Sequence, residues 1–162
     1  QENLAFTIIL ALRFFERQEI KVHIPNSVLV TPQHIRVASD EKTRPYGFYI
    51  KKLPEKDENA IGKRFIGASV RDALEVLRST SDWGMGCEIF QYLAILNPEY
   101  FNPLDTEGLL NINLPGLVAS SKGDGHFNKV PSIDFYNGKI FLTFIDPIDR
   151  GGGSGCGSLI QS

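Results

Sequence analysis

The spacing of apolar positions along the chain predicts three helices. Residues 3–18 carry apolar side chains at the 3.6-residue period of an α-helix, and further apolar residues widen this stripe around most of the helix. A second helix is expected over about 69–79, with Ser69 as its N-cap. A third apolar stretch, about 87–96, is expected to be helical and is stopped by an Asn-Pro pair.

Runs of β-branched and aromatic residues, several alternating with polar residues at period two, predict strands. The expected strands are 20–24, 27–31, 46–52, 109–114, 123–130, 133–136 and 139–145. Asn137-Gly138, between the last two, is the strongest hairpin signal in the chain. The order of these elements predicts an α+β fold with an N-terminal helix and strands, a central helix and a C-terminal antiparallel meander.

The 162 residues suit a single domain over 1–162, since no internal repeat or long linker divides them. Residues 53–64 are polar and are expected to form a surface loop, and the glycine-rich segment at about 150–162 is expected to be a tail that is mobile at its start. The apolar run at 4–15 is too short to span a bilayer, so no membrane partner is expected. The chain begins with Gln1 instead of Met, which indicates a processed or excised piece.

Charge and composition narrow the classes of partner and cofactor. The net charge of −2 argues against a nucleic-acid partner, because proteins that neutralise phosphates usually carry a basic excess. A domain of this length buries enough surface to fold without a disulfide or a structural metal. His23 and His34 have no cysteine or carboxylate at the spacing of a zinc site, and no other pattern indicates a metal or a cofactor. Any chemistry is therefore expected to come from side chains alone.

The two cysteines, Cys87 and Cys156, are compatible with one disulfide bridge or with two free thiols. Cys87 follows the run Trp83-Gly84-Met85-Gly86 and begins the apolar helix. A helix N-terminus lowers the pKa of a thiol, and Gly84 and Gly86 would let a substrate approach the backbone beside a wall formed by Trp83. The competing interpretation is that Cys87 is a small, buried apolar residue.

His126 is the candidate base for a Cys87 nucleophile, and Asp146 is the candidate that orients this base. His126 follows Gly123-Asp124-Gly125 at the start of an expected strand, and Asp146 ends the strand after the next hairpin. Paired residues of neighbouring strands lie about 5 Å apart, so a histidine and a carboxylate at such positions can meet. We expect the three residues to converge at one edge of the sheet, although each taken singly is also common as a core or turn residue.

The segment Gly86–Leu96 resembles the nucleophile helix of the transglutaminase-like and papain-like cysteine enzymes, in which a Gly-x-Cys opens an apolar helix. The segment from Gly125-His126 to Asp146-Pro147 is similar to the later core of that superfamily, where a histidine begins one strand and an aspartate ends the next. The resemblance covers roughly residues 66–150. The chain lacks the tryptophan usual after the histidine, the arginine-bearing segment after the nucleophile helix, and a Gln or Asn oxyanion donor just upstream of Cys87.

This resemblance implies a reaction. His126 would take the proton of Cys87 while Asp146 holds the imidazole tautomer. The thiolate would attack the amide carbonyl of a glutamine side chain or of a peptide bond, and an amine or water would resolve the thioester. An amine would give cross-linking, and water would give deamidation or proteolysis. The implied partner is a protein or peptide substrate.

Two other functions stay open. The glycine-rich tail and the aromatic strands are also compatible with a non-catalytic interaction or assembly module, such as a piece of a viral or secreted structural protein. Asp134 and Lys139 are, more weakly, compatible with a nuclease-like pair of an acid and a lysine. The pKa of the Cys87 thiol distinguishes the enzyme from the assembly module.

Overall fold

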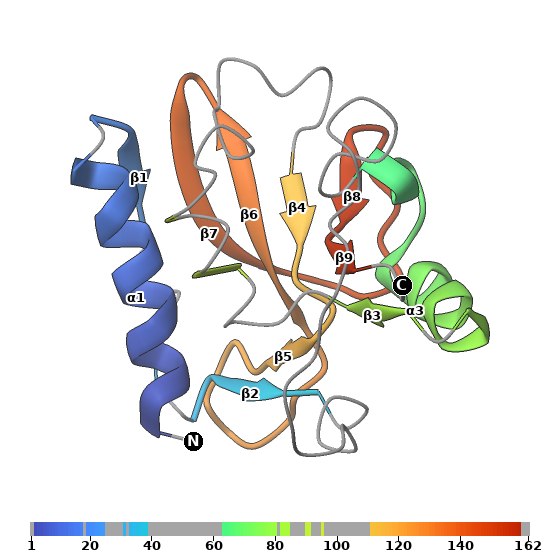
Figure 1. The fold of residues 1–162 in the computed structure, drawn as a ribbon. Coiled ribbons are helices and arrows are strands. Elements are labelled where there is room, and N and C mark those ends of the chain that lie inside the picture. Colours follow the sequence, from blue (N-terminus) through green and yellow to red (C-terminus); the bar gives the residue numbers. More distant parts are fainter. Residues whose placement is uncertain are drawn as a thin grey trace.

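Figure 1 shows the fold in a computed structural model. The structure describes residues 2–17, 19–24, 31, 33–38, 63–80, 82–84, 90, 91, 95 and 111–159. The strand expected at 46–52 lies outside these residues, as do nearly all of the strand expected at 27–31 and of the loop expected at 53–64. Within the described ranges, no helix combines the length and the apolar character needed to cross a membrane.

Five strands form a central mixed sheet in the spatial order β1-β7-β6-β4-β8 (Figure 1). Antiparallel pairing joins β4 to β6 and β6 to β7, as a meander requires, whereas β1 joins β7 and β8 joins β4 in parallel at the two ends of this order. The mixture of helices with this sheet confirms the α+β class. The strand bounds are β1 Lys21–His23, β4 Asn111–Asn113, β6 Val130–Tyr136, β7 Lys139–Ile145 and β8 Ser154–Cys156.

The hairpin of β6 and β7 turns at Asn137-Gly138, as predicted. Both residues have positive φ, 49° and 68°, which a two-residue hairpin turn that matches the twist of the strands requires. Tyr136 and Lys139 pair directly across the turn, and the pairing continues to Val130 opposite Ile145. The turn therefore sets the register of β6 and β7, the two longest strands among the described residues.

One face of the sheet is apolar and is buried against helix α1 (Glu2–Arg17), which confirms the helix predicted at 3–18. Alternation along each strand sends every second side chain to this face. Complete burial of each large apolar side chain there contributes about 1.5–3 kcal/mol. The main core includes Ile8, Leu12 and Phe15 from α1 and Ile112, Ile133, Phe135, Ile140 and Leu142 from the sheet.

Helix α3 (Val70–Ser79) and the short 3-10 helix η2 (Lys63–Phe65) pack near one end of the opposite face, around Val130 and Cys156. Figure 1 shows α1 and α3 on opposite sides of the sheet. The predicted N-cap is confirmed, since Ser69 Oγ accepts a hydrogen bond of 3.1 Å from the backbone N–H of Asp72. The two helices thus cover different parts of the sheet, with α1 beside β1 and with η2 and α3 beside β8 and β3.

Two further strand pairs are too short to leave a periodic signal in the sequence. Strand β2 (Ile35–Val37) pairs with β5 (Leu117–Ala119), and β3 (Trp83–Gly84) pairs with β9 (Ser158–Leu159), both antiparallel. The second pair connects the segment before Cys87 to the end of the chain.

Two predicted segments differ from the structure. The strand expected at 123–130 is a loop as far as 128, because Gly123 and Gly125 have positive φ and Asp124 accepts hydrogen bonds within the loop. Residues expected to form a mobile tail instead form β8 and β9. The glycines there give no side-chain signal, but their backbone finds hydrogen-bonding partners on β4 and β3.

Helix α1 ends in a Schellman motif that has a glutamate where glycine is usual. The N–H of Glu19 donates to the carbonyl of Glu16, and the N–H of Ile20 donates to that of Phe15, each at 3.1 Å. Glu19 has a φ of 64°, in the left-handed region where a side chain costs about 1–2 kcal/mol. The connection to β1 is therefore strained at one residue.

Glu19→Gly is expected to raise the free energy of unfolding by about 1 kcal/mol, because glycine adopts this conformation without a clash. Urea denaturation measures the change. Glu19→Gln is the matched control, since it removes the charge and keeps the strain. A gain of equal size in both variants would contradict the conformational explanation.

Candidate functional site

Strand pairing holds Trp83 and Gly84, which lie just before Cys87 in the sequence. These residues form β3, where Trp83 lies opposite Leu159 and Gly84 lies opposite Ser158. Gly84 is buried, and a Cβ built on it would lie 3.0 Å from Pro115 Cγ. Gly84 was predicted to let a substrate approach the backbone. In the structure it instead allows two backbone segments to pack closely.

Cys87 and Gly86 lie outside the described residues, and so does the side chain of Trp83. In the helix expected at 87–96, the described positions 90, 91 and 95 are helical. Phe90 is completely buried, and its ring centroid lies 6.2 Å from that of Phe15 in α1. The helix expected to carry the nucleophile is thus joined to the main core three residues after Cys87.

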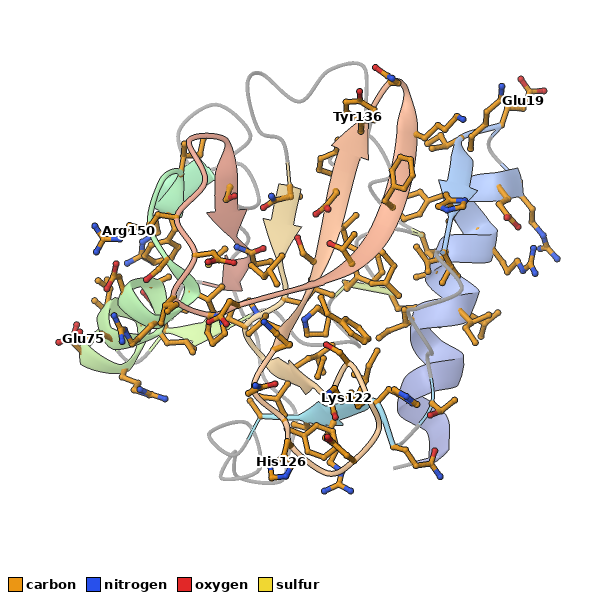
Figure 2. All side chains as sticks on the ribbon, turned by 180° about the vertical axis from the view of Figure 1, so that it is seen from behind. Glu19, Glu75, Lys122, His126, Tyr136 and Arg150 are labelled. Atoms are coloured by element: carbon orange, nitrogen blue, oxygen red, sulfur yellow. The ribbon has the colours of Figure 1, made fainter. Side chains whose placement is uncertain are left out.

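His126 lies in the exposed loop that leads into β6 (Figure 2). Asp124 Oδ1 holds this loop by accepting hydrogen bonds of 3.0 Å from the backbone N–H of His126 and from the hydroxyl of Ser120. The pKa of the Asp124 carboxyl is lowered by these two bonds, the backbone bond being the larger cause. A carboxylate is therefore close to His126, but it is not the predicted one.

Asp146 follows the end of β7, as predicted, and its carboxylate has two partners. Lys129 Nζ donates to Oδ2 at 3.1 Å, and the backbone N–H of Ile148 donates to Oδ1 at 3.3 Å. These bonds lower the pKa of the Asp146 carboxyl, with the lysine as the larger cause. No hydrogen bond joins Asp146 to His126 in the described part of the chain. The predicted partner of Asp146 was the imidazole of His126, and Lys129 is its partner instead. Lys129 directly precedes Val130, which pairs with Ile145, the residue before Asp146.

Cys156 is a free and completely buried thiol in β8. Burial raises its pKa to about 11, and a contact of 3.8 Å from Asn113 Nδ2 to Sγ offsets this only in part. At neutral pH roughly one molecule in 10⁴ would carry a thiolate at such a site. Cys156 is therefore a core residue without nucleophilic character.

A layer of polar side chains crosses four strands on the sheet face opposite α1. The register places Asn111 between Asp134 and Ser154, and Asn113 between Ser132 and Cys156. Thr143 of β7 lies opposite Ser132. The alternations Asn-Ile-Asn at 111–113 and Ser-Ile-Asp at 132–134 are the sequence signal of this layer. Asp134 was predicted only as a possible partner of Lys139, and no shared polar layer was predicted.

The carboxyl of Asp134 is the titratable centre of this polar layer. Ser132 Oγ donates to Oδ1 and Thr143 Oγ1 donates to Oδ2, both at 2.8 Å. Burial raises the pKa of Asp134, and the two hydroxyl bonds act against this rise. The site thus favours a protonated carboxyl more than water does.

The side-chain oxygens of Asn111 and Asn113 are two acceptors in this layer without a hydrogen-bond donor. Their side-chain nitrogens contact Ser154 Oγ at 3.0 Å and Cys156 Sγ at 3.8 Å, but neither buried Oδ1 atom accepts a hydrogen bond. A buried acceptor without a partner costs about 1–3 kcal/mol. The described residues contain no group of three or more His, Cys, Asp or Glu side chains suited to a metal ion.

Asp134→Asn tests the raised pKa through the pH dependence of stability. Because the folded protein holds this proton more tightly than the unfolded chain, the contribution of Asp134 is complete below the unfolded pKa of 3.8 and is lost as pH rises through the folded pKa. The free energy of unfolding of the variant, relative to the parent protein, should therefore rise between about pH 4 and pH 7. Urea titrations at several pH values measure it.

Asp149→Asn is the control, since it removes an exposed carboxylate from the loop after β7. The carboxyls with lowered pKa, Asp72, Asp124 and Asp146, are the same in the parent and in Asp134→Asn, so their titration cancels in the difference. A difference that stays constant or falls with pH would contradict the assignment.

No protein-family model, curated protein or solved structure matches this chain. The resemblance to the cysteine enzymes rests on the quoted residues alone.

Proposed function

We propose that this protein is a cysteine-dependent enzyme that transfers or hydrolyses the acyl group of an amide, with Cys87 as the nucleophile. The proposal is supported mainly by the burial and the raised pKa of the other thiol, that of Cys156. Cys156 is free, buried and has a pKa raised to about 11. Of the two cysteines in the chain, Cys87 is the one left for thiol chemistry.

The surroundings of Cys87 along the chain support this role. Gly84 is held by β9 and by Pro115 on one side, and Phe90 is held by the main core on the other. A nucleophile needs such fixed neighbours, because a small misplacement of the attacking atom costs much of the rate. The helix expected to begin at Cys87 would also favour the thiolate through its dipole.

The proposal assigns His126 as the base that receives the thiol proton. Attack of the thiolate on the amide would form the thioester and release ammonia or an amine, which takes the proton held by His126. A second amine or water would then attack the thioester and release the thiol. Two carboxylates compete for the orienting role. Asp146, the predicted one, would have to exchange its bond to Lys129, whereas Asp124 already bonds the backbone of His126.

Alkylation of the native protein with iodoacetamide over a range of pH tests the nucleophile. We expect one fast-reacting thiol, mapped to Cys87 by peptide mass spectrometry, with a midpoint below the ordinary thiol pKa of about 8.5. Cys156→Ser should leave this reaction unchanged, and Cys87→Ser should abolish it. Cys156 should react only after denaturation, because it is buried. A Cys87 midpoint at or above 8.5 would remove the enzyme proposal.

His126→Ala tests the base. Loss of a neighbouring imidazolium is expected to raise the Cys87 midpoint by about one pH unit or more. His23→Ala is the control, because His23 is an exposed histidine of β1. An unchanged midpoint in His126→Ala would exclude His126. Of the two carboxylates, the orienting one is the residue whose Asn variant shifts the same midpoint.

A non-catalytic assembly module is the second candidate, and the surface of α1 favours it. Ile9 and Leu10 are exposed to 37% and 41%. A hollow of about 290 Å³ beside the helix is lined by four apolar residues, Ile9, Leu12, Val22 and Ile24, and by the ion pair of Arg13 and Glu16. An ordinary pKa for Cys87 together with self-association of the chain would favour this second function.

A further inference from the structure

The exposed end of the polar sheet face carries aromatic and basic side chains on three neighbouring strands. The register places Lys21, Lys139 and Tyr136 in one row, and His23 and Phe141 in the next. The Phe141 ring centroid lies 5.2 Å from that of His23 and 6.4 Å from that of Tyr136. We call these five residues the basic-aromatic patch.

Tyr136 is the ring most available to a partner. It is 66% exposed, next to the hairpin turn, and points away from the main core (Figure 2). The Tyr136 and Phe141 rings are inclined at 63°, so each offers its own face and they do not form one flat platform. A planar group that stacks on Tyr136 would extend the row of rings.

The charges of the patch are not balanced within the described part of the chain. Lys21 and Lys139 lie directly opposite each other in the parallel pair, an arrangement of like charges that destabilises a sheet. Neither ammonium forms an ion pair with a described residue. The two carboxylates of Glu16 and Glu19 line the same hollow as the lysines, and Glu16 is bonded to Arg13 at 2.6 Å.

The lysines open onto a hollow that has room for a ligand group. The hollow has a volume of about 490 Å³ and is lined by Glu16, Lys139 and the segment 19–23. Its lining includes His23, so it is continuous with the aromatic row. Two exposed ammonium groups without an ion-pair partner among the described residues can bind an anion, and exposed rings beside them suit a planar aromatic group.

We propose that the basic-aromatic patch binds single-stranded nucleic acid, independently of the thiol chemistry. A base stacks on Tyr136, and the flanking phosphates contact Lys21 and Lys139. Proteins that bind single strands combine in this way a basic surface, which follows the backbone, with aromatic rings, on which bases stack. The net charge of −2 predicted no such partner, but the five residues of the patch include two lysines and no carboxylate. With two phosphate contacts the binding is weak and salt-sensitive.

Fluorescence anisotropy of labelled oligothymidylate and oligouridylate with the full chain tests the proposal. The logarithm of the association constant should fall against the logarithm of salt concentration with a slope of about −1.4, the value for two contacts to a single strand. A duplex of the same length should bind more weakly, because its bases are already stacked. Absence of binding to both oligonucleotides at low salt would overturn the proposal.

Single substitutions separate stacking from charge. Tyr136→Ala should weaken binding about 5-fold or more, and Tyr136→Phe should keep it. Lys21→Gln and Lys139→Gln should each weaken binding and reduce the salt slope by about 0.7. Glu19→Gln should strengthen binding, because it removes a carboxylate that lines the hollow. Tyr136 is exposed, so these effects do not depend on a loss of folding, and urea denaturation of each variant checks this.

Lys122→Gln is the matched control for charge. Lys122 is an exposed lysine at the opposite end of the molecule from Tyr136 (Figure 2). If Lys122→Gln weakens binding as much as Lys21→Gln does, the attraction is general and the patch is not the site. Dextran sulfate is a second control, because it is a polyanion without aromatic rings. If it binds as tightly as the oligonucleotides and Tyr136→Ala has no effect, the partner is any polyanion and the proposal fails.

Discussion

The register between β6 and β7 is the constraint on which the arrangement of the other side chains depends. Because side chains alternate along a strand, a slip of one residue would exchange the apolar and polar faces of both strands. The turn at Asn137-Gly138 fixes this register through two residues with positive φ. Ile133, Phe135, Ile140 and Leu142 consequently face α1. Ser132, Asp134 and Thr143 face the other way and meet the asparagines of β4.

The sheet face opposite α1 changes in polarity and in exposure along the strands. Near α3 it is apolar and closed, where Val130 and Cys156 belong to a second core. In the middle it holds the hydroxyls, asparagines and carboxyl around Asp134, and at the turn it is exposed, basic and aromatic. This gradient gives one sheet face three environments. It explains why a thiol, a carboxyl and a lysine on neighbouring strands differ so strongly in their exposure to water.

Burial makes Cys156 unsuited to thiol chemistry. The thiol of Cys156 is surrounded by core side chains, and its pKa is raised because a thiolate there would lose its hydration. The loops around His126 and Asp146 follow a different principle. Asp124 binds donors of its own loop, the Ser120 hydroxyl and the His126 N–H, whereas Asp146 binds Lys129, which the pairing of β6 with β7 brings beside it. The partners of Asp124 are therefore local in the sequence, and the partner of Asp146 is set by strand register.

The sequence by itself determined the elements whose signal is local. The apolar period of α1, the N-cap at Ser69, the Asn-Gly turn and strand β7 follow from the conformational preferences of neighbouring residues, and the structure agrees with them. Strand β6 was predicted only over 133–136, and it begins at Val130. Part of the candidate site, Cys87 and Gly86, lies outside the described residues and stays a prediction.

Tertiary structure alone decided which segments meet. The strands β8 and β9 have almost no side-chain pattern, and their backbones are stabilised by partners far away in the sequence. The neighbours of Asp146, the burial of Cys156 and the row of Lys21, Lys139 and Tyr136 likewise depend on strand order and register. These contacts could not be read from the chain because their energy comes from residues that only folding brings together.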